Sequence, residues 1–549
     1  MTTEALTVAV IVLALGLAAT AFRAFSVHRE ATTLAGYFLG NRKLGPQLTN
    51  QNLWATSFAL ANGLAYFSTL GYKYGFKAAL FQIPWFLSFV LLAWQVPKIL
   101  KITSNKTLHK FLGDHYGDWV RILSACVSLL AVLSTVLYEI HVSSQIILQT
   151  LHRETISIGP DFYVFIVVTA VLAIWYVDAG GFLGTAKTDK IQNGSGFYAT
   201  CGLILGLILA GLSLSNTTQF GEKVMEATVG STEFGYEAIP LLVVSGVLCY
   251  ASVWNIVDPS NWQAWSANSD LIDNITVNRL KKETLKAAGK MLIFPCASGV
   301  TIGVLARSAG IGTNEYDHFA TAVIISIDQW ASLFGLFSLN STGHMIIVGL
   351  LTGLICFGLF SLALSTIDSY MISASQTYCW DLHKKHRITI ETIISTDDDN
   401  PTPEIINTGK PIVQTAKHFL YIATLTCIFL FEVMVKFISK ESDVFVVQFL
   451  MGSMLVSIAP PLIAAFIHES RGKQTPNIPI LSWGIVLALA GGVLATIISA
   501  INAIMRGDAF NAYAWGPIAS LLISASMVVI TYIVWICVVK VEGVKNGGV

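Results

Sequence analysis

Long apolar runs separated by short polar segments make up most of this 549-residue chain. A helix needs about 20 apolar residues to cross roughly 30 Å of membrane hydrocarbon. Thirteen runs approach or exceed that length, at residues 5–22, 50–71, 76–97, 122–147, 161–179, 191–214, 238–257, 290–309, 343–376, 414–436, 444–467, 480–504 and 515–539. The pattern predicts an all-α integral membrane protein with about 13 transmembrane helices.

The basic residues between these runs indicate how the helices are oriented. The alternating segments carry 25 Lys and Arg on one side of the membrane and 8 on the other. Cytoplasmic segments carry the excess of positive charge, so the richer side is the cytoplasmic one. Glu4 precedes the first run and Arg23 follows it, which favours an uncleaved helix over a signal peptide. We expect a multi-pass protein of the plasma or inner membrane, with its N-terminus outside and its C-terminus in the cytoplasm.

Composition narrows the functional classes. Charged residues are 12% of the chain, against roughly 25% in a soluble domain. Lys plus Arg equals Asp plus Glu at 33 each, so no excess charge indicates a nucleic-acid partner. The eight cysteines are scattered without a C-x-x-C pair, unlike a disulfide framework or zinc site. The cytoplasmic segments carry no nucleophile motif and no cluster of His, Asp and Glu, so we do not expect an enzyme.

Two of the predicted helices carry polar residues at mid-membrane depth. They are residues 49–63 in the second run and residues 254–259 at the end of the seventh. Small polar residues can simply let helices pack closely, but irregular backbone in a membrane also lines cavities. Each interrupted run opens a set of five runs, and the two sets have opposite orientation. Interrupted segments at matching places in two inverted halves are typical of secondary transporters.

The spacing of the runs predicts a single transporter domain. Residues 1–47 would form an extra helix and a cytoplasmic loop, and residues 48–215 the first five-helix repeat. Residues 238–467 would form the inverted second repeat, and residues 480–549 two further helices and a tail. The longest polar segment, 381–413, is too polar to pack into a core and is interpreted as a mobile cytoplasmic loop.

Ionisable residues within the runs need a partner or a cavity, because charge inside a membrane is costly. Glu139 and His141 lie in the fourth run, Asp368 in the ninth and Glu432 in the tenth. Glu432 lies about one turn from Lys436, which predicts a local ion pair. For Glu139, a functional role and a hydrogen-bonded structural role both remain open. Asp368 is expected to act in function or structure within a serine-rich segment.

Several segments together resemble the sodium/solute symporter family, which includes the sodium–glucose, sodium–proline and sodium–sialic acid transporters. They are Tyr37–Gly45 (YFLGNRKLG), Leu53–Ala59 (LWATSFA), Gly180–Leu183 with Thr188–Gln192 (GGFL…TDKIQ), and Ser365–Ser369 with Ser373–Ser375 and Asp381. The segments occur in the family's order within a chain of thirteen predicted spans. Lys187 and the segment 262–264 depart from the family pattern, which weakens any transfer of substrate identity.

The resemblance implies a leucine-transporter (LeuT) fold: two inverted five-helix repeats with one extra helix before and two after. It also implies a Na⁺ site formed by Ala55, Phe58, Leu362, Ser365 and Thr366. Na⁺ is a hard cation that takes oxygen ligands, and carbonyls with two neutral hydroxyls would bind it without holding it too tightly. The alternative for the two hydroxyls is a hydrogen bond to a carbonyl one turn back in their own helix.

The resemblance further implies a role for Asp189 in ion release; a charge at a helix N-terminus near Lys187 and Lys190 is the alternative. By family position, substrate would contact Asn62, Tyr66, Gln82, Tyr250, Val253, Trp254 and Gln448. These side chains are amide, aromatic or aliphatic and include no Lys or Arg, which argues against a strongly anionic solute. The aromatic rings could form a gate or stack on a ring or a cation.

The function expected is Na⁺-coupled symport of a small neutral or zwitterionic organic solute into the cell by alternating access. Its partners would be Na⁺, the solute and the lipid bilayer, with no nucleic acid. A proton-coupled transporter of the same fold, with Glu139 as the candidate proton-binding group, is one alternative. A transporter-like sensor or channel is another, although the inverted arrangement and the ten residues after the last run count against it.

Overall fold

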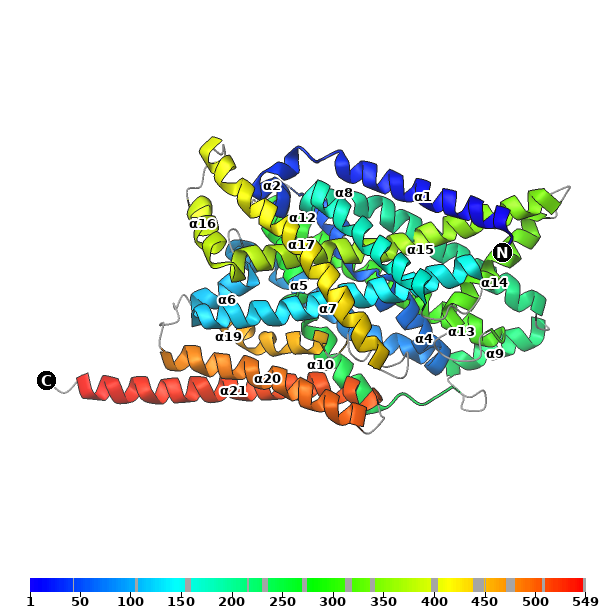
Figure 1. The fold of residues 1–549 in the computed structure, drawn as a ribbon. Helices are drawn as coiled ribbons and strands as arrows, with labels where there is room; N and C mark the ends of the chain where they lie inside the picture. The colour runs from blue at the N-terminus through cyan, green and yellow to red at the C-terminus, as the bar shows by residue number, and fades with distance from the viewer. Residues whose placement is uncertain are drawn as a thin grey trace.

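The computed structural model contains helices and no strands in the residues it describes. It describes all residues except 43, 104–106, 154–158, 215–216, 230–235, 269–273, 312–317, 336–340, 396–402, 438–448, 450, 471–478, 506–508 and 547–549. Most of the long helices run in a common direction, and the two termini lie at opposite ends of the bundle (Figure 1). The predicted all-α membrane architecture is confirmed.

The helices have the following bounds. They are α1 (Thr3–Phe25), α2 (Leu34–Leu39), α3 (Pro46–Ser57), α4 (Tyr66–Tyr74), α5 (Ile83–Thr103), α6 (Leu108–Tyr116), α7 (Asp118–His152), α8 (Pro160–Leu214), α9 (Thr217–Val229), α10 (Leu241–Val257), α11 (Pro259–Ser266), α12 (Asn274–Met291), α13 (Ser298–Ser308), α14 (His318–Gly335), α15 (Ser341–Thr377), α16 (Lys384–Ser395), α17 (Pro403–Phe437), α19 (Ala459–Ser470), α20 (Pro479–Met505) and α21 (Ala509–Asn546). Short 3₁₀ or π turns join several of them, including η3 (Leu60–Ala65), η4 (Gly75–Gln82), η7 (Leu292–Ala297) and η8 (Tyr378–Leu382).

Eleven helical stretches of the described chain are long and apolar enough to cross a membrane. Two of them overlap two predicted spans each: 60–97 covers the second half of 50–71 and all of 76–97, and 160–213 covers 161–179 and nearly all of 191–214. Each is interrupted by a glycine with positive φ, Gly75 (φ 68°) and Gly181 (φ 53°), which falls between the two predicted spans. Glycine adopts these angles without the steric cost that a Cβ imposes. Eleven continuous stretches are therefore compatible with thirteen crossings, although the number thirteen itself stays a prediction.

The central helix of the bundle is α15, which packs against α1, α7 and α8. Its contact with α1 uses Gly349 and Gly353, whose α-carbons face the carbonyl oxygens of Ala5 and Ala9. A Cβ built at either glycine would come within 2.7 Å of one of those oxygens. Small residues four apart let membrane helices approach closely, where attraction comes from van der Waals packing rather than the hydrophobic effect.

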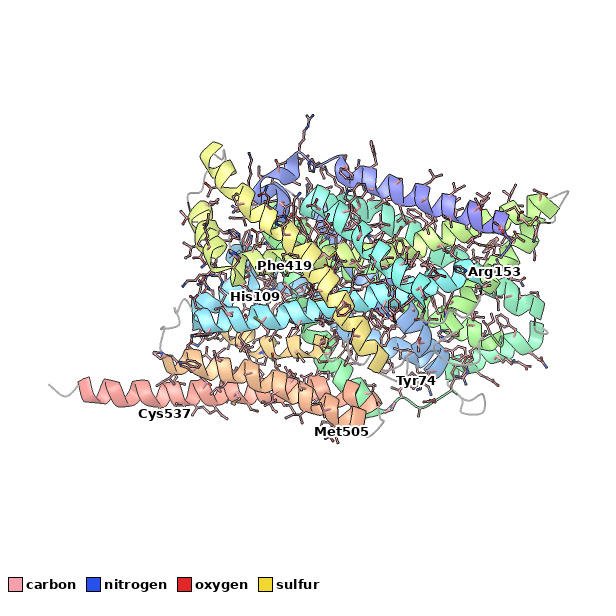
Figure 2. All side chains as sticks on the ribbon, viewed as in Figure 1. Tyr74, His109, Arg153, Phe419, Met505 and Cys537 are labelled. Carbon is pink, nitrogen blue, oxygen red and sulfur yellow. The ribbon has the colours of Figure 1, made fainter. Side chains whose placement is uncertain are left out.

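Large apolar side chains on the outer helices face away from the protein. Phe22, Trp94, Ile422, Phe429 and Leu522 each leave 60–78% of their surface uncovered. In water such an exposed set would be a liability, whereas in a bilayer these side chains contact lipid. The side chains drawn in Figure 2 cover the bundle along its whole length, between the end near His109 and the end near Arg153.

The segment 381–413 is not the loop that its polarity suggested. Residues 384–395 form α16, and α17 begins at Pro403. Arg121 of α7 donates hydrogen bonds to Glu391 of α16 (2.6 Å) and to the carbonyl of Trp380 (2.6 Å). The loop prediction is wrong for 384–395 and 403–413, because α16 buries Ile390 in the core and its Glu391 accepts a hydrogen bond from Arg121 of α7. Residues 396–402 lie outside the described residues.

Candidate functional site

The second predicted span is interrupted where its sequence predicted. Helix α3 ends at Ser57, Phe58 caps it with φ −91° and ψ 60°, and Ala59 is extended. The helix then resumes as η3 and continues into α4. At this break the helical hydrogen bonds stop. The carbonyls of the last turn of α3 and the first amides of η3 can therefore bind an ion or a side chain instead.

The seventh predicted span is interrupted at Asp258, between α10 and α11. Asp258 has extended backbone angles (φ −72°, ψ 114°) and is 2% exposed. Its carboxylate accepts hydrogen bonds from the Ser260 amide (2.8 Å), the Ser260 hydroxyl (2.7 Å) and the Tyr370 hydroxyl (3.2 Å). An aspartate followed by proline is a favourable helix start, because the side chain satisfies a free amide and proline lacks one.

Helix α15 brings two hydroxyls to the interrupted end of α3. The Ser365 hydroxyl lies 2.9 Å from the carbonyl oxygen of Leu362 and 3.3 Å from that of Ala55. The Thr366 hydroxyl lies 3.3 Å from both the Leu362 and the Thr56 carbonyl oxygens. All five residues are at least 93% buried. Both hydroxyls therefore make the hydrogen bond within α15 that was the alternative to an ion site. Both also contact backbone carbonyl oxygens of α3.

Four of the residues proposed for Na⁺ therefore lie in one oxygen-rich cluster, and the fifth, Phe58, caps the adjoining helix end. The cluster adds the Thr56 carbonyl, which sequence reasoning did not include. Carbonyls and hydroxyls without a carboxylate are a neutral set of hard ligands suited to a monovalent cation that must also leave.

Asp189 belongs to a second polar cluster beside the first. It is fully buried on α8, eight residues beyond the interruption at Gly181, and so does not stand at a helix N-terminus. The Asn52 amide donates to Asp189 (3.1 Å) and to the Ser369 hydroxyl (3.3 Å), which joins α3, α8 and α15.

Asp368, next to Ser369, is also fully buried and accepts a hydrogen bond from Tyr176 (2.8 Å). The Gln192 amide donates to the same Tyr176 hydroxyl (3.3 Å). One oxygen of Asp368 and one of Asp189 have no hydrogen-bond partner among the described residues. Two buried carboxyl groups, each with one unpartnered oxygen, therefore lie beside the hydroxyl cluster.

A cavity lies between the two helix breaks. Its lining comprises Thr56, Ser57, Ala59, Asn62, Tyr66, Phe67, Gln82, Trp85, Thr135, Val247, Tyr250, Trp254, Asn255, Met291, Pro295, Thr366, Tyr370 and Phe449. Thr56 and Thr366 belong both to this lining and to the hydroxyl cluster. The cavity therefore meets the candidate ion ligands directly.

The predicted substrate residues fall into three groups. Asn62, Tyr66, Gln82, Tyr250 and Trp254 line the cavity. Val253 packs against the apolar core instead, because it lies one residue round the helix from Trp254. Gln448 lies outside the described residues.

Sequence reasoning missed several cavity residues, among them Trp85, Thr135, Asn255, Tyr370 and Phe449. Phe449 and Trp85 reach the cavity from helices whose apolar pattern carries no local sign of it. Asn255 and Tyr370 lie beside residues that the sequence did single out. Their positions next to Trp254 and Ser369 are the sequence signal from which Asn255 and Tyr370 could have been predicted.

The aromatic side of the cavity is packed ring against ring. The Trp254 ring centroid lies 5.0 Å from that of Tyr250 and 6.0 Å from that of Trp85. Tyr250 also lies 4.6 Å from Phe449. Rings in such contact hold one another in place, so a change at one of them alters the shape of the cavity.

Replacing Trp254 by alanine is expected to lower the initial uptake rate per folded molecule by about tenfold or more. An alanine removes a wall of the cavity and releases its aromatic neighbours, and a core change of this size also costs about 3–5 kcal/mol of stability. Yield, melting temperature and uptake rate are measured on the same variant. Trp265→Ala is the control, because Trp265 is fully buried in α11 outside the cavity lining. An unchanged rate per folded Trp254→Ala molecule would place the solute site elsewhere.

Glu432 has a partner on another helix. It pairs with His141 of α7 at 2.7 Å, across the contact between α7 and α17. Interhelical packing brings these two side chains together, which the local spacing of Glu432 and Lys436 does not reveal. The side chain of Lys436 lies outside the described residues.

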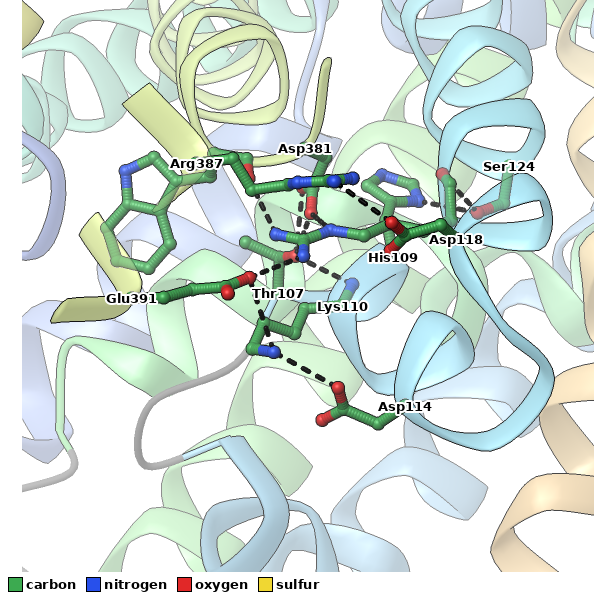
Figure 3. Close-up of polar contacts among 11 residues, drawn as sticks. Thr107, His109, Lys110, Asp114, Asp118, Ser124, Asp381, Arg387 and Glu391 are labelled. Carbon is green, nitrogen blue, oxygen red and sulfur yellow. Dashed lines mark hydrogen bonds and ion pairs between the residues drawn. The ribbon is translucent and has the colours of Figure 1, made fainter. Parts of the chain in front are cut away.

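At the end of the bundle near His109, a polar network joins α6, α7, η8 and α16 (Figure 3). Arg121 donates to Asp381 (2.8 Å) and Glu391 (2.6 Å), and Thr107 donates to both Asp381 oxygens (2.9 Å). Burial lowers the pKa of the neighbouring His109 to about 4, so this histidine is neutral at physiological pH. Arg121 and Asp381 are 5% and 0% exposed. A buried, hydrogen-bonded ion pair thus fixes these four elements to one another.

Comparisons with known proteins concern the family and the fold of this chain. The model of the Sodium:solute symporter family matches residues 37–257. A solved Na⁺-coupled sialic acid symporter, in a substrate-bound outward-open state, is 16% identical and superposes with a TM-score of 0.62 over 95% of this chain and 98% of that one. Mhp1, a nucleobase-cation-symport-1 family transporter, is 11% identical with a TM-score of 0.43, over 90% and 94% of the two chains. No significant match was found among curated protein sequences.

The predicted resemblance to the sodium/solute symporters is confirmed, and the fold is of the leucine-transporter type that the resemblance implied. The matched segment 37–257 includes α3, its break, the Asp189 segment and all of α10.

Proposed function

We propose that this protein couples the entry of Na⁺ to the uptake of a small neutral or zwitterionic organic solute, as a symporter of the sodium/solute symporter type. The observation that carries the proposal is the junction of two sites. The Ser365 and Thr366 hydroxyls meet the Ala55 and Thr56 carbonyls at the end of α3. Thr56 and Thr366 also line the cavity between the two helix breaks.

This junction supplies a physical route for coupling. A Na⁺ ion bound to the hydroxyl cluster would tie α15 to the broken end of α3, since the ligands come from both helices. The same break continues into Asn62 and Tyr66, which line the cavity. An ion that orders the break therefore orders part of the solute site, so each ligand would raise the affinity for the other.

Asp189 and Asp368 extend the proposal to ion release. Their carboxylates lie in the cluster that Asn52 and Ser369 connect to the same two helices. A cation that leaves the hydroxyls of Ser365 and Thr366 would meet two carboxyl groups, each with an unpartnered oxygen, which fits the release role that the resemblance implies for Asp189.

The two breaks support alternating access, in which one half of the fold moves against the other around a fixed site. The division into repeats 48–215 and 238–467 is part of the proposal, as is the orientation with the N-terminus outside. Basic residues place the cytoplasmic side at the end that carries α16 and Arg121, by their excess in those segments.

Uptake is expected to follow a Na⁺ gradient and to be insensitive to a protonophore at fixed pH. The hydroxyl cluster takes a cation through neutral oxygens, and it includes no lysine that could replace Na⁺ by a proton. The solute is first found by a thermal-shift screen of purified protein against a solute panel, with and without Na⁺. Solute-dependent ²²Na⁺ flux and solute uptake are then measured in proteoliposomes.

Two results would contradict this prediction. Uptake driven by a pH gradient without Na⁺ would indicate a proton-coupled transporter. Na⁺ flux that does not depend on solute would indicate a channel.

A further inference from the structure

Glu139 is a buried carboxyl group that the proposed coupling does not use. It lies on α7 and is 0% exposed. One carboxyl oxygen accepts a hydrogen bond from the Ala61 amide (2.8 Å). The other accepts from the Asn62 amide (3.1 Å) and from the Asn62 side-chain nitrogen (3.1 Å). All three donors belong to the start of the outer half of the broken second span.

The N-terminal end of this helical segment favours a negatively charged group. Residues 60–74 form one continuous helical segment, η3 followed by α4. The first amides of a helix have no partner within it and carry the positive end of the helix dipole. In membrane helices interrupted at mid-depth, such a terminus binds an anionic group of the transported solute. Here the carboxylate of Glu139 already fills it.

The hydrogen bonds also indicate the charge of Glu139 and the orientation of the Asn62 side-chain amide. Both oxygens of Glu139 act as acceptors, which fits a carboxylate anion, since a protonated acid would direct an O–H toward an N–H. The Asn62 amide turns its nitrogen to Glu139. Its carbonyl oxygen is therefore directed away from Glu139, and Asn62 lines the cavity. The cavity gains a hydrogen-bond acceptor at this point and no anion site.

We propose that Glu139 is an internal anion that takes the place of a solute carboxylate and restricts the cavity to solutes without an anionic group at that end. Within the neutral or zwitterionic class of the proposed function, the solute directs an N–H or O–H donor, and not an anionic group, at the Asn62 carbonyl. Amino acids that approach with their carboxylate toward the broken helix are excluded by repulsion from Glu139. The solute class rests on the proposed function, whereas the occupied anion site does not.

Refilling the site with a small anion tests the proposal. Glu139→Ala leaves the amides of Ala61 and Asn62 without an acceptor, so its melting temperature should fall by several degrees. Sodium formate, compared with sodium chloride at the same Na⁺ concentration, should restore at least half of that loss. Formamide, which has the size of formate without its charge, should restore none. Wild-type protein should respond equally to the two sodium salts.

Thr135→Ala is the matched control. Thr135 lies one turn before Glu139 on α7, lines the same cavity, and donates its hydroxyl to the Ala131 carbonyl of its own helix. Its removal opens space without exposing a helix terminus, so formate should have no specific effect. Equal rescue of both variants, or equal rescue by formate and formamide, would overturn the anion site.

Glu139→Gln keeps the size of the side chain and removes its charge. Its amide nitrogen must face one of the N–H donors, so this variant should also melt at a lower temperature and gain nothing from formate. A melting temperature equal to that of the wild type would overturn the proposal even if Glu139→Ala does not fold. None of these measurements depends on transport or on Na⁺ coupling, so they stand apart from the test of the proposed function.

Discussion

Thr366→Ala is expected to raise the Na⁺ concentration for half-maximal uptake by roughly 10- to 100-fold. A hydrogen bond or ligand contact to a charged group contributes about 1.5–3 kcal/mol, and each 1.4 kcal/mol is a tenfold change in affinity. The Thr366 hydroxyl lies 3.3 Å from carbonyls on both α15 and α3, where the proposed ion would replace these weak contacts. The loss should therefore appear in Na⁺ dependence rather than in membrane insertion.

Thr200→Ala is the control for this experiment. Thr200 is fully buried on α8, and its hydroxyl donates to the Gly196 carbonyl four residues back (2.8 Å). It therefore has the same bond within its own helix as Thr366, but lies outside the hydroxyl cluster. Uptake is measured in proteoliposomes over a series of Na⁺ concentrations at constant ionic strength. A Na⁺ dependence of Thr366→Ala equal to that of Thr200→Ala would remove Thr366 from the ion site.

Arg121→Ala is expected to destabilise the protein by about 3 kcal/mol or more. Asp381 is fully buried and Arg121 is its only basic partner in the polar contacts of the described residues. Removing one member of a buried ion pair costs about 3–5 kcal/mol, because the remaining charge stays desolvated. The melting temperature should fall, and the contacts between α7, η8 and α16 should become accessible to proteolysis.

Arg387→Ala provides a matched comparison at the same end of the bundle. Arg387 pairs with Asp118 at 3.0 Å, but the Asp118 side chain is 67% exposed. An exposed ion pair contributes about 0–1 kcal/mol, so this variant should melt close to the wild type. Equal melting temperatures for the two arginine variants would show that the buried pair does not hold these elements together.

The third member of the network responds to pH in a defined direction. Burial alone would raise the pKa of Glu391, but hydrogen bonding to Arg121 and the charge of Lys110 lower it below its usual value. A carboxyl with a lowered pKa in the folded state adds stability above its unfolded pKa and loses it as the pH falls through the folded pKa. The contact between α16 and α7 therefore persists at mildly acidic pH.

The sequence by itself determined the features that depend on local patterns. Runs of about 20 apolar residues predicted the membrane helices, because a bilayer requires that length of apolar helix whatever its neighbours are. Polar residues within 49–63 and the Asp258–Pro259 pair predicted the two breaks, because helix interruption is decided by the residues at the break itself. Both breaks are present. The resemblance supplied Ser365 and Thr366, which lie where a cation site needs them.

Tertiary packing decided which polar groups meet. Glu432 pairs with His141 of another helix, and Asp189 is buried against Asn52 rather than standing at a helix N-terminus. Segment 384–395 is a helix because Arg121, more than 260 residues earlier, binds Glu391. The role of Glu139 was open in the sequence, since only the fold brings α7 to the amides of Ala61 and Asn62. Such contacts depend on how helices far apart in the chain pack, and no local pattern encodes that.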